Sequence, residues 1–246
     1  MSLKPYQGKY IIGNERPYKI SRSKIENFIK CPRCFYLDRR LKIGQPSGPP
    51  FTINSAVDNL LKNEFDRYRA IQEPHPYMIR LGLNAVPFQH EKLDDWRENF
   101  KGVSYIDMNH NFHLHGAVDD IWQDTKTGEL IVVEYKATSK SAEITLDADW
   151  QFSYKRQIEI YQFLLRQNGF EVSNTSYFVY CNGIRDKSAF DECMEFQVSL
   201  IPYVGDDSWL QDALSNIYDT LNQDKIPGYT EECAYCEYQR KLDTLI

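Results

Sequence analysis

The chain has 246 residues, of which 42% are hydrophobic and 14% aromatic, so it can bury a sizeable core and does not have a disordered composition. Its net charge of −6 argues against a protein held on nucleic acid by overall positive charge, although a local basic groove beside an acidic site is compatible with it. No run approaches the roughly 18 apolar residues of a membrane helix, and the polar N-terminus lacks the apolar region of a secretory signal. We therefore expect a cytoplasmic protein without membrane partners.

Helices are expected first along the chain. Ser23, with Glu26 three residues later, has the spacing of a capping box and predicts a helix start. Pro32 should interrupt that helix. A second helix is predicted over residues 55–72, where apolar side chains repeat at helical spacing. These side chains are Val57, Leu60, Leu61 and Phe65.

From about residue 103 the pattern changes to strands. Residues 103–138 are predicted to form three strands joined by turns, with Gly128 supplying the unusual backbone angle of a hairpin. An amphipathic helix over residues 151–168 ends at Gly169. Strands at 173–183 and 194–203 follow, and then a helix that begins at about residue 206 and ends before Pro227. This order predicts an α/β (α+β) protein built around a small mixed sheet.

An acid and a lysine, Glu134 and Lys136, end the apolar run Leu130 to Val133. Residues two apart on a strand share a face, so the two charges project together and Tyr135 points the other way. If the strand is buried on both faces, the pair lies at its carboxyl end, where ligands bind in open α/β sheets. The alternative is a surface ion pair where a strand meets solvent.

A second acid strengthens the case for a site. His115, Ala117 and Asp119 are predicted to share one face of a strand whose hairpin partner carries Glu134. Acids on adjacent strands can share one Mg²⁺, which polarises a phosphoryl oxygen and lowers the pKa of a bound water. Lys136 could then orient or deprotonate that water, or stabilise the transition state. The alternative is a solvated strand end.

The helix over residues 151–168 contributes a third element. Gln157 and Tyr161 are four residues apart and therefore lie on one helix face. Lys155 and Arg156 precede them and are candidate phosphate contacts. An ordinary amphipathic helix is the alternative reading.

The six cysteines divide into two groups. Cys181 and Cys193 are isolated and are expected to be buried as small hydrophobic residues. The others form two Cys-x-x-Cys pairs near opposite ends of the chain. Disulfides are not expected among them, because the protein is expected to be cytosolic. Four thiolates can bind zinc or an iron–sulfur cluster, and the spacing does not choose between them; free thiols are the alternative. The four are Cys31, Cys34, Cys233 and Cys236.

Taken in order, Gly116-x-x-Asp119, Glu134-x-Lys136 and Gln157-x-x-x-Tyr161 resemble the motifs of the PD-(D/E)XK nuclease superfamily. "SRSKIENFIKCPRCFYL" and "CAYCEY" resemble the terminal signatures of its RecB-like branch, which includes CRISPR-associated exonucleases with a cysteine-bound cluster. The resemblance implies a restriction-endonuclease-like core, with a central mixed sheet flanked by helices and with helical terminal segments joined by a four-cysteine site. It implies one nuclease domain over residues 1–246, with a helical part at 21–102, a catalytic core at 103–205 and a C-terminal helix and tail at 206–246.

The resemblance also implies roles for individual residues. Lys136 would be the catalytic lysine, and Gln157 and Tyr161 would position the lysine or the nucleic acid. The family usually has a histidine ligand on an early helix, whereas the corresponding stretch here offers Asp58, which can also bind Mg²⁺ or Mn²⁺. The implied ligands of Mg²⁺ or Mn²⁺ are Asp119, Glu134, the backbone carbonyl of Tyr135, and Asp58.

The implied function is a metal-dependent nuclease hydrolysing DNA, an exonuclease on single strands or ends, within a larger nucleic-acid-processing complex. The similar exonucleases carry a [4Fe–4S] cluster on one early and three late cysteines. The resemblance therefore implies a [4Fe–4S] cluster, and the two-and-two split here, which departs from that pattern, leaves Zn²⁺ as the alternative. Two other functional classes stay open: a non-catalytic nucleic-acid-binding module, and a cluster-bearing structural or redox protein.

Nucleic-acid contacts outside the motifs are also conceivable from the sequence. Aromatic residues could stack on bases, and arginines could hold phosphates. The alternative for the aromatic residues is a place in the core, and the alternative for the arginines is a solvated helix face. The candidates are Phe35, Tyr36 and Tyr154, and Arg33, Arg39 and Arg40.

Overall fold

The computed structural model describes residues 3–46, 48 and 52–245. The chain divides into two compact units, and the terminal unit combines both chain ends with one internal segment: Met1–Pro49, Ser104–Gly116 and Ser208–Ile246. The central unit comprises Pro50–Val103 and Ala117–Asp207. No helix among the described residues is both long and apolar enough to cross a membrane.

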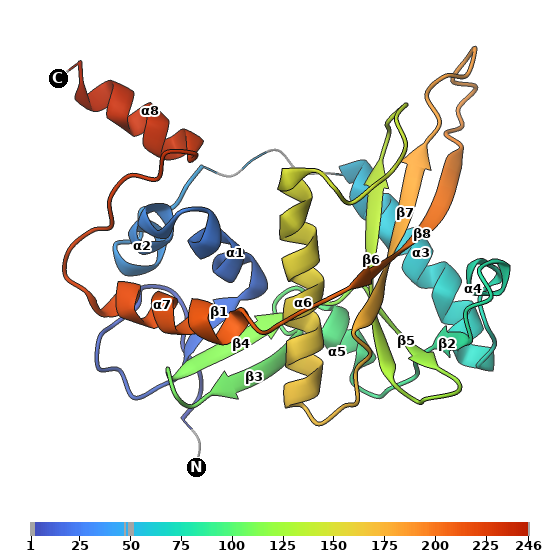
Figure 1. Ribbon diagram of the computed structural model, residues 1–246, viewed down its shortest axis with the longest axis horizontal. Helices are drawn as coiled ribbons and strands as arrows, with labels where there is room; N and C mark the ends of the chain where they lie inside the picture. Colours follow the sequence, from blue (N-terminus) through green and yellow to red (C-terminus); the bar gives the residue numbers. More distant parts are fainter. Residues whose placement is uncertain (1–2, 47, 49–51, 246) are drawn as a thin grey trace. The chain divides into compact units, whose positions relative to one another are not determined.

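The terminal unit is a small sheet covered by helices (Figure 1). Its strands lie in the order β1-β4-β3, with β1 and β4 parallel. Helix α7 packs against α1 and α2, and apolar side chains such as Ile20, Phe35 and Leu214 are fully buried beneath them. The elements are β1 Tyr18–Ser21, α1 Arg22–Lys30, α2 Pro32–Arg40, β3 Val103–Asp107, β4 Phe112–Gly116, α7 Leu210–Asn222 and α8 Ala234–Asp243.

The central unit is built on a five-stranded mixed sheet in the order β2-β5-β6-β7-β8. Strands β6 and β7 are parallel and are connected through α6, whereas the other neighbouring strands are antiparallel. The elements are α3 Thr52–Ile71, α4 Pro76–Arg80, β2 Ala85–Pro87, α5 Leu93–Arg97, β5 Asp120–Asp124, β6 Leu130–Thr138, the 3-10 helix η1 Asp149–Gln151, α6 Phe152–Gln167, β7 Thr175–Gly183 and β8 Phe196–Val204.

Strand β6 lies at the centre of this unit, with α3 and α6 on opposite sides of it (Figure 1). Alternate β6 side chains, including Val133 and Tyr135, pack with Leu61 and Phe65 of α3. The intervening residues of β6 face α6. The sheet flanked by helices is the expected α/β, restriction-endonuclease-like arrangement, and it leaves the end of β6 between two helices.

The hairpin between β5 and β6 confirms the predicted pairing. Asp120 is the register partner of Val133, and Gly128 has the positive φ of 80° that the turn requires. The prediction that Asp119 shares a strand face with His115 is wrong. Strand β4 ends at Gly116 and belongs to the other sheet, so Asp119 lies in the connection immediately before β5.

The predicted capping box at Ser23 is also wrong. Helix α1 begins at Arg22 after Ser21, which forms no side-chain capping bond. Ser21 is the last residue of β1, so the end of the strand fixes the start of the helix. Its Oγ instead lies 2.9 Å from the Oγ of Ser23.

Two expected core residues are exposed. Leu60 is 67% exposed, whereas Leu61 is buried, because neighbouring residues on a helix lie about 100° apart and only one of them can face the sheet. Cys193 is exposed in the connection between β7 and β8, and Cys181 is buried in β7 as expected.

Candidate active site

A cavity of about 350 Å³ opens at the carboxyl-terminal part of β6, entirely within the central unit. It brings together residues from α3, from the connection before β5, and from β6 and α6. Four residues of the predicted site line it: Asp58, Asp119, Tyr135 and Lys136. The full lining is Asn54, Ser55, Val57, Asp58, Asp119, Tyr135, Lys136, Ala137 and Tyr154.

The predicted acid–lysine pair is joined to the predicted glutamine and tyrosine. Lys136 Nζ donates to Glu134 Oε1 over 2.6 Å and to Gln157 Oε1 over 3.3 Å. Gln157 Nε2 donates to the same Glu134 oxygen over 2.6 Å and to the Tyr161 hydroxyl over 3.1 Å. Burial alone would lower the pKa of Lys136, but the charges of Glu134 and Asp119 outweigh it and raise that pKa. The lysine is therefore a fixed cation beside the acids.

Asp119 is held by the backbone of β6. Its Oδ2 accepts a 2.9 Å hydrogen bond from the Tyr135 amide, so the acid sits beside the end of the strand although it is not itself in a strand. Burial raises the pKa of Asp119 to about 7, and the charge of Glu134 acts in the same direction. The two carboxylates thus repel each other in a site shielded from water.

Asp58 lines the cavity from α3, and it pairs with Lys62 of the same helix, a residue that the sequence reasoning missed. Lys62 Nζ lies 2.8 Å from Asp58 Oδ2 and 3.9 Å from Asp119 Oδ1. Burial raises the pKa of Asp58, and the charge of Asp119 adds to this effect. The spacing of four residues between Asp58 and Lys62 was the available signal, but on a helix it is typical of an ordinary surface ion pair.

The donor set fits a divalent cation that prefers oxygen. Glu134 Oε2 and Asp58 Oδ1 are buried and have no hydrogen-bond partner among the described residues. Buried carboxylate oxygens without a partner are costly, and a cation shared with Asp119 would satisfy them. The ligand atoms of the three acids are not all within 4.8 Å of one another. Lys62, placed between Asp58 and Asp119, accounts for this wider spacing.

A buried ion-pair network lies behind β6. Asp120, which has no exposed surface, accepts from Arg69 over 2.5 Å and from Arg97 over 2.7 Å. The Tyr135 hydroxyl donates to its other oxygen over 2.8 Å. Tyr135 is therefore fixed at its side chain by Asp120 and at its amide by Asp119, and the network anchors the strand end that carries the site.

Only some of the predicted nucleic-acid contacts line the cavity. Lys155 and Arg156 on α6 do not line the cavity; the ammonium of Lys155 lies over the rings of Phe152 and Tyr203. Tyr154 does line the cavity, with Lys136 Nζ 4.2 Å from its ring centre.

The other sequence candidates have structural positions in the terminal unit. Phe35 and Tyr36 are buried in its core. Arg39 pairs with Asp38. Arg33 and Arg40 donate to backbone carbonyls of the same unit.

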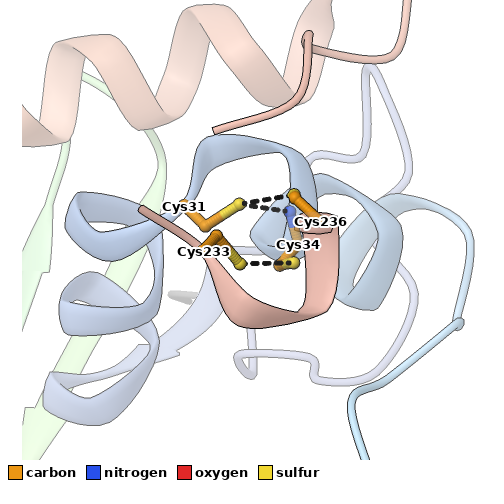
Figure 2. A group of neighbouring side chains, drawn as sticks. All are labelled: Cys31, Cys34, Cys233 and Cys236. Atoms are coloured by element: carbon orange, nitrogen blue, oxygen red, sulfur yellow. Dashed lines mark hydrogen bonds between the residues drawn. The ribbon is translucent and has the colours of Figure 1, made fainter. Parts of the chain in front are cut away.

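The four predicted cysteines meet in the terminal unit (Figure 2). Their sulfur atoms all lie within 4.8 Å of one another, the only such group of His, Cys, Asp or Glu ligand atoms among the described residues. The Sγ atoms of Cys31 and Cys236 are 3.5 Å apart, and those of Cys34 and Cys233 are 3.6 Å apart. The two ends of the chain therefore build a four-thiol site able to hold a metal.

Each cysteine pair lies at the start of a helix. Cys31 and Cys233 are the residues that cap the N-termini of α2 and α8, and the second cysteine of each pair lies in the first turn. A helix N-terminus favours negative charge and so favours thiolates, the form that binds metals. Burial raises the pKa of Cys31, but hydrogen bonds from Thr230 and Cys34 outweigh it and lower that pKa to about 7.

Comparisons with known proteins identify the family of the chain. Residues 19–240 match the family model of the PD-(D/E)XK nuclease superfamily. A solved structure described as "Crystal structure of SSO0001" is similar at 15% sequence identity and a TM-score of 0.41, covering 90% of this chain and 84% of that chain. No curated protein matches the sequence. Because the family model spans nearly the whole chain, this protein belongs to the PD-(D/E)XK nuclease superfamily.

Proposed function

We propose that this protein is a metal-dependent deoxyribonuclease, acting as an exonuclease on single-stranded DNA or DNA ends, with both units forming one nuclease domain. The observation that carries this proposal is the hydrogen bonding of the two carboxylate oxygens of Glu134. One of its oxygens accepts hydrogen bonds from Lys136 and Gln157, while the other is buried and has no hydrogen-bond partner among the described residues. Nucleic acid is the substrate class of the superfamily, and assembly into a larger processing complex is a further expectation.

The reaction is hydrolysis of a phosphodiester bond. A water oxygen bonds to phosphorus and the bond from phosphorus to one sugar oxygen breaks, which leaves a phosphate monoester and a hydroxyl group. Lys136 is placed to orient the water and to stabilise negative charge that develops on the phosphoryl oxygens. Its raised pKa favours the electrostatic role over direct proton abstraction.

Asp58, Asp119 and Glu134, with the Tyr135 carbonyl, would hold Mg²⁺ or Mn²⁺. When bound, such an ion polarises a phosphoryl oxygen and lowers the pKa of a bound water. Gln157 keeps one Glu134 oxygen and the lysine in place, and Tyr161 fixes Gln157 from the next helical turn. Lys155 and Arg156 would contact phosphates at a distance from the cavity.

Substrate and metal requirements test this function. End-labelled single-stranded DNA, duplex DNA with ends, circular DNA and RNA should be incubated with Mg²⁺, with Mn²⁺ and with chelator. We expect metal-dependent release of nucleotides from single strands or ends and none with chelator. Metal-dependent cleavage of RNA alone would contradict the DNA assignment. Binding of DNA without any cleavage would identify a non-catalytic module instead.

For the four-cysteine site, the sulfur spacing favours a single tetrahedral ion, Zn²⁺, over the [4Fe–4S] cluster expected from the resemblance. Four thiolates about 2.3 Å from one zinc are about 3.8 Å apart, close to the 3.5 and 3.6 Å of the two closest pairs. In a [4Fe–4S] cluster each thiolate binds a different iron, which requires wider spacing. The two-and-two distribution of cysteines supports the same choice.

A further inference from the structure

A row of lysines and aromatic rings leads outward from the cavity in the central unit. Lys136 Nζ lies 4.2 Å from the ring centre of Tyr154. Tyr154 meets Trp150 edge to face, with 5.3 Å between ring centres. Lys140 Nζ lies 4.8 Å from the Trp150 ring centre. We call these four residues the aromatic row. It begins at the proposed catalytic lysine and ends in solvent.

Trp150 is exposed to solvent at the outer end of the aromatic row. It is 50% exposed, although an indole ring is normally among the most buried side chains of a protein. The adjacent Phe152 is 48% exposed. Exposed aromatic side chains beside a polar cavity indicate a binding surface. A flat ring with the ammonium group of Lys140 beside it matches a base with its phosphate.

The backbone that carries the row is held in place. Lys140 exchanges two hydrogen bonds with the Asn182 side chain of β7, over 2.8 and 2.9 Å. The residue after Trp150, Gln151, is buried and bonds to Ala148 and Thr145. The exposed indole therefore sits on a fixed turn, and stacking on it would cost little ordering of the protein.

We propose that Trp150 is a stacking platform for an unpaired base of a single-stranded nucleic acid whose phosphates follow Lys140 toward the cavity. This inference rests on the proposed nuclease function and names the strand form that the site receives. Bases in a duplex are stacked on each other and present no free face, so the platform selects single strands. The sugar class is left to the binding test, because stacking uses the base alone.

Binding measured with chelator present separates this proposal from catalysis. The probes are fluorescein-labelled 15-nucleotide oligothymidylate, the matching oligouridylate, and a 15-base-pair duplex. Trp150→Ala is expected to weaken single-strand binding about 5- to 150-fold, the loss of one stacked base. Trp150→Phe should retain most of the affinity, and Trp150→Leu, which is apolar but has no ring, should lose as much as Trp150→Ala.

Phe100→Ala is the matched control, because Phe100 is an exposed aromatic of the same unit, 84% exposed, that does not line the cavity. It should leave single-strand affinity unchanged within about twofold. Unfolding temperatures of all variants should match that of wild type, because each changed side chain is exposed. Trp150→Leu, which keeps much of the apolar volume and has no ring, keeps the test valid if Trp150→Ala folds poorly.

The outcomes distinguish this inference from the proposed function. Unchanged single-strand binding in Trp150→Leu, an equal loss on the duplex, or no single-strand binding by wild type would overturn the platform. Single-strand binding that depends on Trp150 in a protein that never cleaves would support the platform and refute the nuclease. Tighter binding of oligothymidylate or of oligouridylate assigns the sugar class.

Discussion

Gln157 is the side chain that joins the acid to the lysine. It contacts Glu134, Lys136 and Tyr161 at once, and it does not itself line the cavity. A residue placed in this way acts by positioning. Its value to the site is geometric, because a misplacement of about 1 Å in an active site can cost about 100-fold in rate.

We predict that Gln157→Ala lowers the cleavage rate by roughly tenfold or more, with little change in KM. A second buried glutamine on the same helix gives the matched control: Gln162 donates to the Ser173 and Asn174 carbonyls, away from the cavity. Gln162→Ala should lower the unfolding temperature and keep the rate per folded molecule. Equal losses of activity in both variants would show that Gln157 serves only stability.

At this scale the strand period could predict that Glu134 and Lys136 project together. The link between Lys136 and Gln157 was implied only by the resemblance to the nuclease motifs. Lys62 could not be predicted. Its role depends on where α3 lies against the end of β6, a tertiary contact that no local pattern encodes.

Among the elements, strand β6 depends on the ion-pair network behind it. Asp120 is fully buried between Arg69 and Arg97, and although burial alone would raise its pKa, the two arginines hold that pKa below the usual range. Removing one partner from a buried ion pair leaves charge without compensation in a medium that solvates it poorly.

Asp120→Asn keeps the shape of the side chain and removes its charge. We predict a loss of about 3–5 kcal/mol in the free energy of unfolding, because both arginines lose their counter-charge. The measurement is urea unfolding followed by circular dichroism. Asp95→Asn, which alters an exposed pair with Lys101, is the control and should be neutral. A neutral effect of Asp120→Asn would mean that water compensates the arginines.

The elements themselves followed the sequence patterns closely where one strong period ran the length of the element, as in α3, α6 and β7. The error over β4 had a physical cause. Residues 112–120 read as one continuous alternating strand, but the chain leaves one sheet at Gly116 and enters another at Asp120. Periodicity reports which side chains are buried and not which sheet buries them.

On the scale of the whole chain, the four cysteines bring together segments about 200 residues apart, which restricts the unfolded ensemble. We predict one zinc per chain by elemental analysis, no visible absorbance after anaerobic purification, and a lower unfolding temperature for Cys31→Ser. Cys193→Ser changes an exposed cysteine outside the site and should leave the unfolding temperature unchanged. Absorbance in the visible blue together with iron would show that the site holds a cluster.

The contact between the two ends of the chain could be predicted, because two Cys-x-x-Cys motifs are typical of one shared metal site. The set of strands that makes up the terminal unit could not be predicted. It takes β3 and β4 from the middle of the sequence, and only the parallel pairing of β1 with β4 reveals this.

The central claim is that the carboxylates and lysine at the end of β6 hydrolyse nucleic acid with a divalent metal. The most direct measurement is the rate of cleavage of end-labelled single-stranded DNA in Mn²⁺ by wild type, Lys136→Ala and the exposed-lysine control Lys101→Ala. The account predicts cleavage by wild type and by the control, and a loss of at least about 100-fold in Lys136→Ala. Cleavage that persists in Lys136→Ala at the wild-type rate would contradict it.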